Sequence, residues 1–163
     1  MKKTLIIIFL SFLSVEISYA AGSSGGDGGA TKKTNYDKAV NLINSAKKLE
    51  KKGKDEKALA KYDKAKQLLI KSNKKSVKYV DTLNYLGFTT RKLGDFENGE
   101  KYYLLGLKIN PNHNGINEYL GELYVTTNRH NLAIERLEVL KGCNCDEYDE
   151  LKSIIAGEKV SKY

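Results

Sequence analysis

Groups that carry catalysis are scarce in this sequence, whose 163 residues include two histidines and two cysteines. Catalysis needs a nucleophile, an acid or a metal ligand held in a pocket. His113 falls in a loop after the single proline and His130 falls in a turn, where a histidine usually caps a helix or faces water. The glycines of residues 22–29 are not followed by Gly-Lys-Ser/Thr, which excludes a phosphate-binding loop. We therefore expect a protein that is not an enzyme and uses no cofactor or metal.

Long apolar runs are also missing, apart from residues 5–15. This run is too short for a membrane-spanning helix, which needs roughly 20 residues. It follows two lysines at the N-terminus and precedes the small residues Ser18 and Ala20, which is the layout of a cleaved signal peptide. We predict a signal peptide over residues 1–20, cut between Ala20 and Ala21. The mature protein is then expected to be periplasmic or secreted, without a permanent membrane span.

Apolar side chains larger than alanine are absent from residues 21–30, which are rich in glycine. Such a composition cannot pack a core, so residues 21–34 are predicted to form a flexible linker. The folded part is expected to begin near Asn35.

Charge of one sign dominates only part of the chain. The formal net charge is +8, but residues 32–78 hold sixteen lysines against five acidic residues, whereas residues 79–163 hold ten basic and thirteen acidic residues. Nucleic-acid binding is not expected, because the lysines are spread around helices and arginine is rare. The basic half indicates either a solvated lysine-rich face or attraction to an acidic partner or an anionic membrane surface.

Two stretches of the chain share a pattern that recurs after 34 residues. The first contains Leu86-Gly87, Gly94-Asp95-Phe96, Gly99, Tyr103 and Pro111, and the second contains Leu120-Gly121, Tyr124, Ala133 and Leu137. This pattern resembles the tetratricopeptide repeat, a pair of antiparallel helices, as found in small exported bacterial proteins. The family often has tryptophan three places before Leu-Gly, where this chain has Leu83 and Asn117.

A more divergent unit precedes these two, with Gly53 standing where Gly94 stands later. The separation of these glycines exceeds the repeat by seven residues, which predicts either a longer second helix or a longer loop around residues 72–76. We expect three units, at about residues 37–79, 80–113 and 114–141, within a repeat region spanning residues 35–142. Residues 143–163 would hold a Cys-x-Cys turn, a capping helix and a tail.

The fold class that follows is all-α, a superhelix of about three helical hairpins and a C-terminal capping helix. Gly87 and Gly121 are expected to let the two helices of one hairpin approach closely, facing Gly99 and Ala133. Gly94, like Gly53, is expected to end a helix in the left-handed conformation.

The resemblance implies a protein- or peptide-binding scaffold whose first helices line a groove. The positions that carry over are Lys47, Lys51, Asn84, Phe88, Arg91, Lys92, Glu118 and Glu122. The groove is expected to be basic at one end and acidic at the other, with Phe88 as an apolar anchor between them. An alternative is an assembly subunit of an envelope or secretion complex that docks through its convex face.

Cys143 and Cys145 are the feature that the repeat does not require. In an oxidising compartment they would form a local disulfide that pins the turn before the capping helix. A redox role stays open, since a bridge across one residue is easily reduced. Metal binding also stays open, although two soft ligands leave a tetrahedral site half empty. A redox or metal accessory protein is therefore a further alternative.

Overall fold

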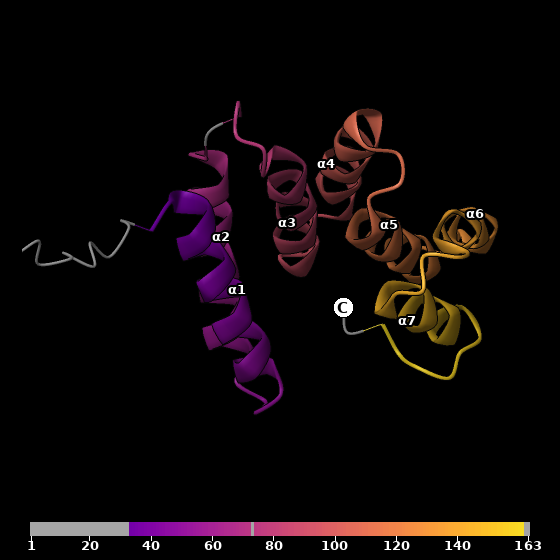
Figure 1. Ribbon diagram of the computed structural model, residues 1–163. Coiled ribbons are helices and arrows are strands. Elements are labelled where there is room, and N and C mark those ends of the chain that lie inside the picture. Colours follow the sequence, from indigo (N-terminus) through magenta and orange to yellow (C-terminus); the bar gives the residue numbers. More distant parts are fainter. Residues whose placement is uncertain (1–32, 73, 162–163) are drawn as a thin grey trace, which may run out of the picture. The chain divides into compact units, whose positions relative to one another are not determined.

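The computed structural model describes residues 33–72 and 74–161. Over these residues it contains seven α-helices and no strand, which confirms the expected all-α class (Figure 1). The helices are α1 Asn35–Glu50, α2 Asp55–Ile70, α3 Tyr79–Lys92, α4 Phe96–Ile109, α5 Asn114–Thr126, α6 His130–Leu140 and α7 Asp146–Ile155. The predicted signal peptide and nearly all of the predicted linker lie outside the described residues.

Consecutive helices pair into hairpins. The most extensive contacts join α1 to α2, α3 to α4 and α5 to α6, while α7 packs on both helices of the third hairpin. The first helices also meet one another, α1 against α3 and α3 against α5. This arrangement is a helical-repeat superhelix of three hairpins with an additional helix at its C-terminal end (Figure 1).

Helix boundaries follow local signals in the sequence. Thr34 and Asp37 form a reciprocal capping box that begins α1. Gly53 and Gly94 have φ angles of 63° and 88°, so both turns use the left-handed conformation that glycine adopts without strain. The equivalent turn of the third hairpin uses Asn128, at φ 59°. These residues fix where each first helix ends.

The seven additional residues of the first unit are distributed over three places. The loop over residues 71–78 is four residues longer than the loop over residues 110–113, α2 is two residues longer than α4, and α3 is one residue longer than α5. The loop therefore accounts for most of the difference, and a lengthened second helix for little of it.

Gly87 and Gly99 lie at the closest approach within the second hairpin. A Cβ atom on Gly87 would lie 2.4 Å from Cε1 of Tyr103, and one on Gly99 would lie 3.2 Å from the carbonyl oxygen of Gly87. Gly121 was expected to face Ala133 of α6, and this is wrong, because the atoms nearest to Gly121 belong to Leu151 of α7. Leu151 fills the space left by the glycine, so Gly121 seats the capping helix on α5.

Asn117, at the position where the family often has tryptophan, is fully buried. Its Nδ2 donates to the carbonyl oxygens of Pro111, at 3.0 Å, and His113, at 3.1 Å. Its Oδ1 accepts from Nη1 of Arg136 at 3.3 Å. The side chain thus joins the start of α5 to α6 through hydrogen bonds. A tryptophan at this position would instead stabilise the contact by burying apolar surface.

Candidate functional site

A groove of about 710 Å³ lies between the first helices of the hairpins and α7. Residues of α1, α3, α5 and α7 line it, together with Lys51 after α1, Asp55 at the start of α2 and Val160 after α7. Six of the eight predicted residues border this groove: Lys47, Lys51, Phe88, Lys92, Glu118 and Glu122. The repeat register therefore places these six residues beside one groove, and their role in binding stays a prediction.

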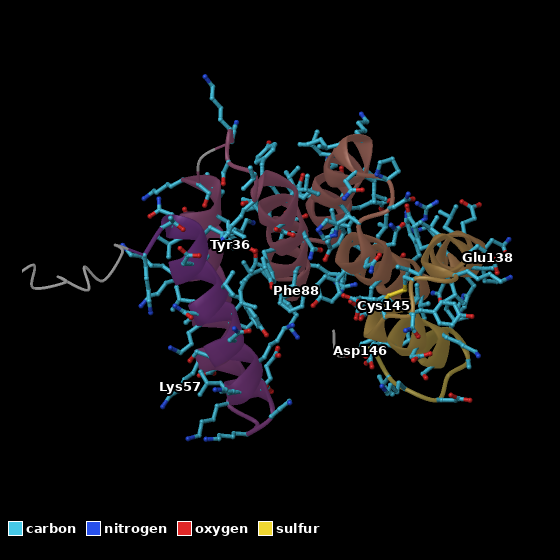
Figure 2. The ribbon with its side chains drawn as sticks, in the orientation of Figure 1. Tyr36, Lys57, Phe88, Glu138, Cys145 and Asp146 are labelled. Atoms are coloured by element: carbon cyan, nitrogen blue, oxygen red, sulfur yellow. A yellow bond between two sulfur atoms is a disulfide. The ribbon has the colours of Figure 1, made fainter. Side chains whose placement is uncertain are left out.

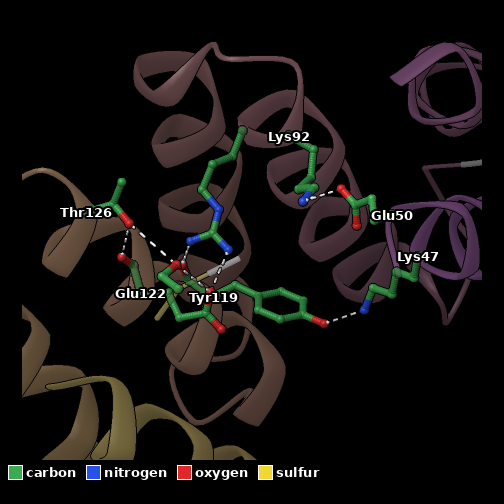
Figure 3. Close-up of polar contacts among 8 residues, drawn as sticks. Lys47, Glu50, Lys92, Tyr119, Glu122 and Thr126 are labelled. Carbon is green, nitrogen blue, oxygen red and sulfur yellow. Dashed lines mark hydrogen bonds and ion pairs between the residues drawn. The ribbon is translucent and has the colours of Figure 1, made fainter. Parts of the chain in front are cut away.

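The basic side of the groove carries Lys47, Lys51 and Lys92, and the carboxylates of Glu50 and Asp55 line it beside them. Lys47 donates from Nζ to the Tyr119 hydroxyl at 3.2 Å, and Nζ of Lys92 lies 2.5 Å from Oε1 of Glu50 (Figure 3). Burial lowers the pKa of Lys47, an effect that the nearby Glu118 carboxyl opposes. Lys51 is exposed at the end of α1. Two of the three lysines thus already have partners within the fold, whereas Lys51 faces solvent.

Phe88 is the floor of the groove and not an open anchor. It projects from α3 and is only 2% exposed (Figure 2). Its ring packs edge-on against Tyr62 at a centroid distance of 5.6 Å and lies 5.1 Å from the ring of Tyr119. Nζ of Lys47 lies 4.6 Å from the Phe88 centroid, in a cation–π contact. A ligand would therefore meet Lys47 and Tyr119 before it met Phe88.

Arg91, predicted to line the groove, is instead buried inside the stack. Its exposed fraction is 1%. Nη1 donates to the carbonyl oxygen of Tyr119 at 2.6 Å, and Nη2 donates to Oε2 of Glu122 at 3.1 Å. This pair joins α3 to α5, because one guanidinium bonds both the backbone and a side chain of the neighbouring helix. Arg91 positions Glu122 and does not face a ligand.

Asn84 also differs from the expectation, with an exposed fraction of 7%. A Cβ atom on Gly115 would lie 2.9 Å from Nδ2 of Asn84, so the amide packs closely against the start of α5. Like Arg91, this residue contributes to the contact between successive hairpins and does not line the groove.

The acidic side of the groove combines α5 with α7. Glu118 and Glu122 come from α5, and Asp146, Glu147 and Glu150 come from α7. Burial, reinforced by the nearby Glu122 and Glu147 carboxylates, raises the pKa of Glu118 to about 8. Lys47 opposes this shift. Glu118 therefore keeps its proton to a higher pH than an exposed glutamate does, which limits the repulsion among these carboxyls.

Sequence reasoning assigned α7 only to capping and missed its contribution to the groove. Asp146, Glu147 and Glu150 have the spacing of one helix face, and this was the available signal. Tyr119 was missed as well, because the position after Glu118 carried no marker in the repeat. Asp146 is the first residue of α7 (Figure 2), and it lines the groove together with Glu147 and Glu150 of the same helix.

His113 and the two cysteines have structural partners, whereas His130 is an exposed residue at the start of α6. His113 caps α5, with Nδ1 accepting from the Ile116 amide at 3.2 Å and Nε2 lying 2.9 Å from Oδ1 of Asp81. Cys143 and Cys145 are joined by a disulfide, and neither lines the groove. Over residues 33–72 and 74–161, no group of three or more His, Cys, Asp or Glu side chains could hold a metal ion.

Comparison with known proteins adds one match. The family model described as "Tetratricopeptide repeat" matches residues 81–113, which cover nearly all of α3 and the whole of α4. The chain matches no curated protein. In the part of the chain that the structure describes, every helix is too short or too polar to cross a membrane. The family supports a role in protein interaction and is typically non-catalytic. With this match in the middle of an all-α stack of hairpins, the second hairpin is a tetratricopeptide repeat, and the fold around it supports a tetratricopeptide-repeat protein.

Proposed function

We propose that this protein is a scaffold that holds a segment of another polypeptide in the groove, outside the cytoplasm. The observation that carries the proposal is the make-up of the groove, where Lys47 and Lys51 lie on one side and Glu118 and Glu122 on the other. Tyr119 and the edge of Phe88 lie between them. A peptide with apolar residues and charges of both signs would match this surface, because such complementarity favours one partner and one orientation.

Export is supported by the pattern of residues 1–20 and by the disulfide between Cys143 and Cys145, since structural disulfides persist in oxidising compartments. N-terminal sequencing of the protein from its native source is expected to start at or near Ala21. Recovery of a soluble cytoplasmic protein that retains Met1 would contradict this part of the proposal.

The groove itself is tested by photo-crosslinking from defined positions in the native setting. A photoreactive residue is placed at Lys51 or Asp146, which are exposed and line the groove. Matched controls carry it at Lys64 of α2 or Lys101 of α4, which are exposed but do not line it. We expect the same partner band from both groove positions and none from the controls. Crosslinks from the control positions alone would rule out the groove.

A second candidate function is docking through the second helices, as an assembly subunit of a larger complex. Among the described helical residues, the exposed large apolar side chains all lie on α2, α4 and α6. They are Leu59, Ile70, Leu104, Leu105, Ile109, Ile134 and Val139. Exposed apolar side chains that gather on one side of a protein often mark an interaction surface. The same crosslinking series separates the two functions, because this one predicts bands from Lys64 and Lys101.

A further inference from the structure

The chain turns back after α7 and returns toward the groove. Gly157 has a φ angle of 75°, the left-handed conformation that ends many helices. The amides of Glu158 and Lys159 both donate to the carbonyl oxygen of Ser153, at 3.0 and 3.2 Å. The segment over residues 158–161, here called the tail, is thereby directed along α7 toward α5.

The tail contacts the acidic side of the groove at successive residues. Lys159 forms an ion pair with Glu150 of α7. Val160 lines the groove but is 87% exposed. The Ser161 hydroxyl donates to Oε2 of Glu122 at 3.2 Å. Val160 therefore borders the groove, while Lys159 and Ser161 contact two of the carboxylates that line it.

Ser161 donates to the carboxylate of Glu122 on α5, which is also the ion-pair partner of Arg91 on α3. Oε2 of Glu122 accepts from both Arg91 and Ser161, and the Thr126 hydroxyl lies 3.5 Å from Oγ of Ser161 (Figure 3). An acceptor already fixed by Arg91 offers a pre-positioned site for one further donor. The tail uses that site with a neutral hydroxyl.

We infer that the tail is an intramolecular occupant of the groove, and that the partner segment is an extended, lysine-bearing peptide that displaces it. This inference rests on the proposed function of the groove. The acidic side presents Glu122, Glu147 and Glu150 beside Glu118, whose raised pKa reflects the crowding of these carboxyls, and a cation there offsets their mutual repulsion. The tail supplies one such cation in Lys159.

The contacts of the tail are suited to displacement. The Lys159–Glu150 pair is partly exposed, and such pairs contribute little to stability. Val160 buries almost none of its surface, and a single neutral hydrogen bond from Ser161 adds little. A peptide with a second lysine and an apolar side chain that becomes buried would form stronger contacts than the tail does. It must, however, compete with a tail that is covalently attached to the protein and therefore present at high local concentration.

The probe for this inference is a fluorescent synthetic peptide with the sequence of residues 156–163, Ala-Gly-Glu-Lys-Val-Ser-Lys-Tyr. Its binding is measured by anisotropy with the wild-type chain and with the full-length variant Ser161→Asp. The new carboxylate would repel Glu122 and release the tail. If the tail occupies the groove in four of five molecules, the variant should bind the peptide about fivefold more tightly than the wild type does.

Two controls test whether peptide binding depends on the charge of the peptide and on the groove. A peptide with both lysines replaced by glutamate should not bind, and Glu150→Gln in the Ser161→Asp background should weaken binding of the original peptide. Glu138→Gln, on an exposed residue of α6 outside the groove, should leave it unchanged. Circular dichroism checks that each variant is folded.

Equal affinity of wild type and Ser161→Asp, no measurable binding to either, or equal affinity for the glutamate peptide would each overturn the inference. The proposed function would still stand in these cases if the partner crosslinks from Lys51 and Asp146. Crosslinks from Lys64 and Lys101 alone would instead overturn the proposed function, and the inference with it.

Discussion

Gly87→Ala tests the closest contact between two helices in the stack. The new methyl group would lie 2.4 Å from Cε1, 2.6 Å from Cδ1 and 2.7 Å from Cζ of Tyr103. Separations under about 3 Å between non-bonded carbons cannot persist, so the ring or the helix must move. Tyr103 of α4 is fully buried, and its core cluster includes Ile116 and Leu120 of α5, so its ring lies between Gly87 of α3 and the next hairpin. Relief therefore requires α3 and α4 to separate slightly.

The expected net effect is a loss of stability. Replacing glycine by alanine inside a helix gains about 1 kcal/mol of helix propensity, whereas overpacking a fixed core costs about 1–3 kcal/mol. We expect Gly87→Ala to lower the free energy of unfolding by about 1 kcal/mol, with the upper end near 2 kcal/mol if the ring stays in place.

Gly121→Ala is the matched control, since it makes the same substitution 34 residues later. The methyl group there would lie 2.5 Å from Cδ2 of Leu151, the flexible end of a side chain on the capping helix. Leu151 is fully buried, but the ends of its side chain can shift more easily than the rigid ring of Tyr103, so we expect Gly121→Ala to lose less stability than Gly87→Ala.

Both variants are measured by urea titration with circular dichroism at 222 nm. Tyr103→Leu in the Gly87→Ala background should recover part of the loss, with a coupling energy above about 0.5 kcal/mol. If Gly87→Ala is as stable as Gly121→Ala, or if the double variant shows no coupling, the contact between Gly87 and Tyr103 does not limit the approach of α3 and α4.

Three further predictions follow from the polar groups. Because the pKa of Glu118 is about 8 in the folded chain and near 4.5 in a model peptide, the folded state retains this proton longer, and its stabilising effect is lost as the pH rises toward 8. Urea midpoints at pH 6 and 9 should differ less for Glu118→Gln than for wild type, and an equal difference would contradict the shift. Arg91→Met should cost about 3 kcal/mol because it leaves Glu122 buried without its cation, and Arg91→Met with Glu122→Met should cost less. If the single and the double variant lose equal stability in thermal unfolding, Arg91 and Glu122 are not coupled. Replacing Cys143 and Cys145 together by serine should change stability by less than about 1 kcal/mol, since the bridge closes a very short loop, and should preserve the crosslink at Lys51. Loss of that crosslink would favour a redox or metal role.

The hairpins could be predicted because their signals are local and periodic. Gly53 and Gly94 mark turns that require a left-handed residue, and Asn110 before Pro111 cannot continue a helix. The 34-residue period then places equivalent residues in equivalent contacts. The partner of Gly121 could not be read in this way, because the repeat pattern describes one hairpin and α7 is not part of a hairpin.

The side of each helix that faces the groove could be predicted, but the depth of each side chain could not. Arg91 and Lys92 are neighbours in sequence and both were assigned to the groove, yet Arg91 is buried by Tyr119 and Glu122 of the next hairpin. Phe88 is covered because Lys47 and Tyr119 extend over it. Such burial depends on the size of side chains in the adjacent unit, which a repeat register does not specify.

The succession of α1, α3, α5 and α7 along the groove gives it a measurable length. Packed helices lie about 8–10 Å apart, so three steps from α1 to α7 span roughly 24–30 Å. An extended chain covers about 3.3–3.6 Å per residue, so roughly seven to nine residues are needed to reach from Lys51 to Glu147. A shorter ligand could not reach Lys51 and Glu147 together.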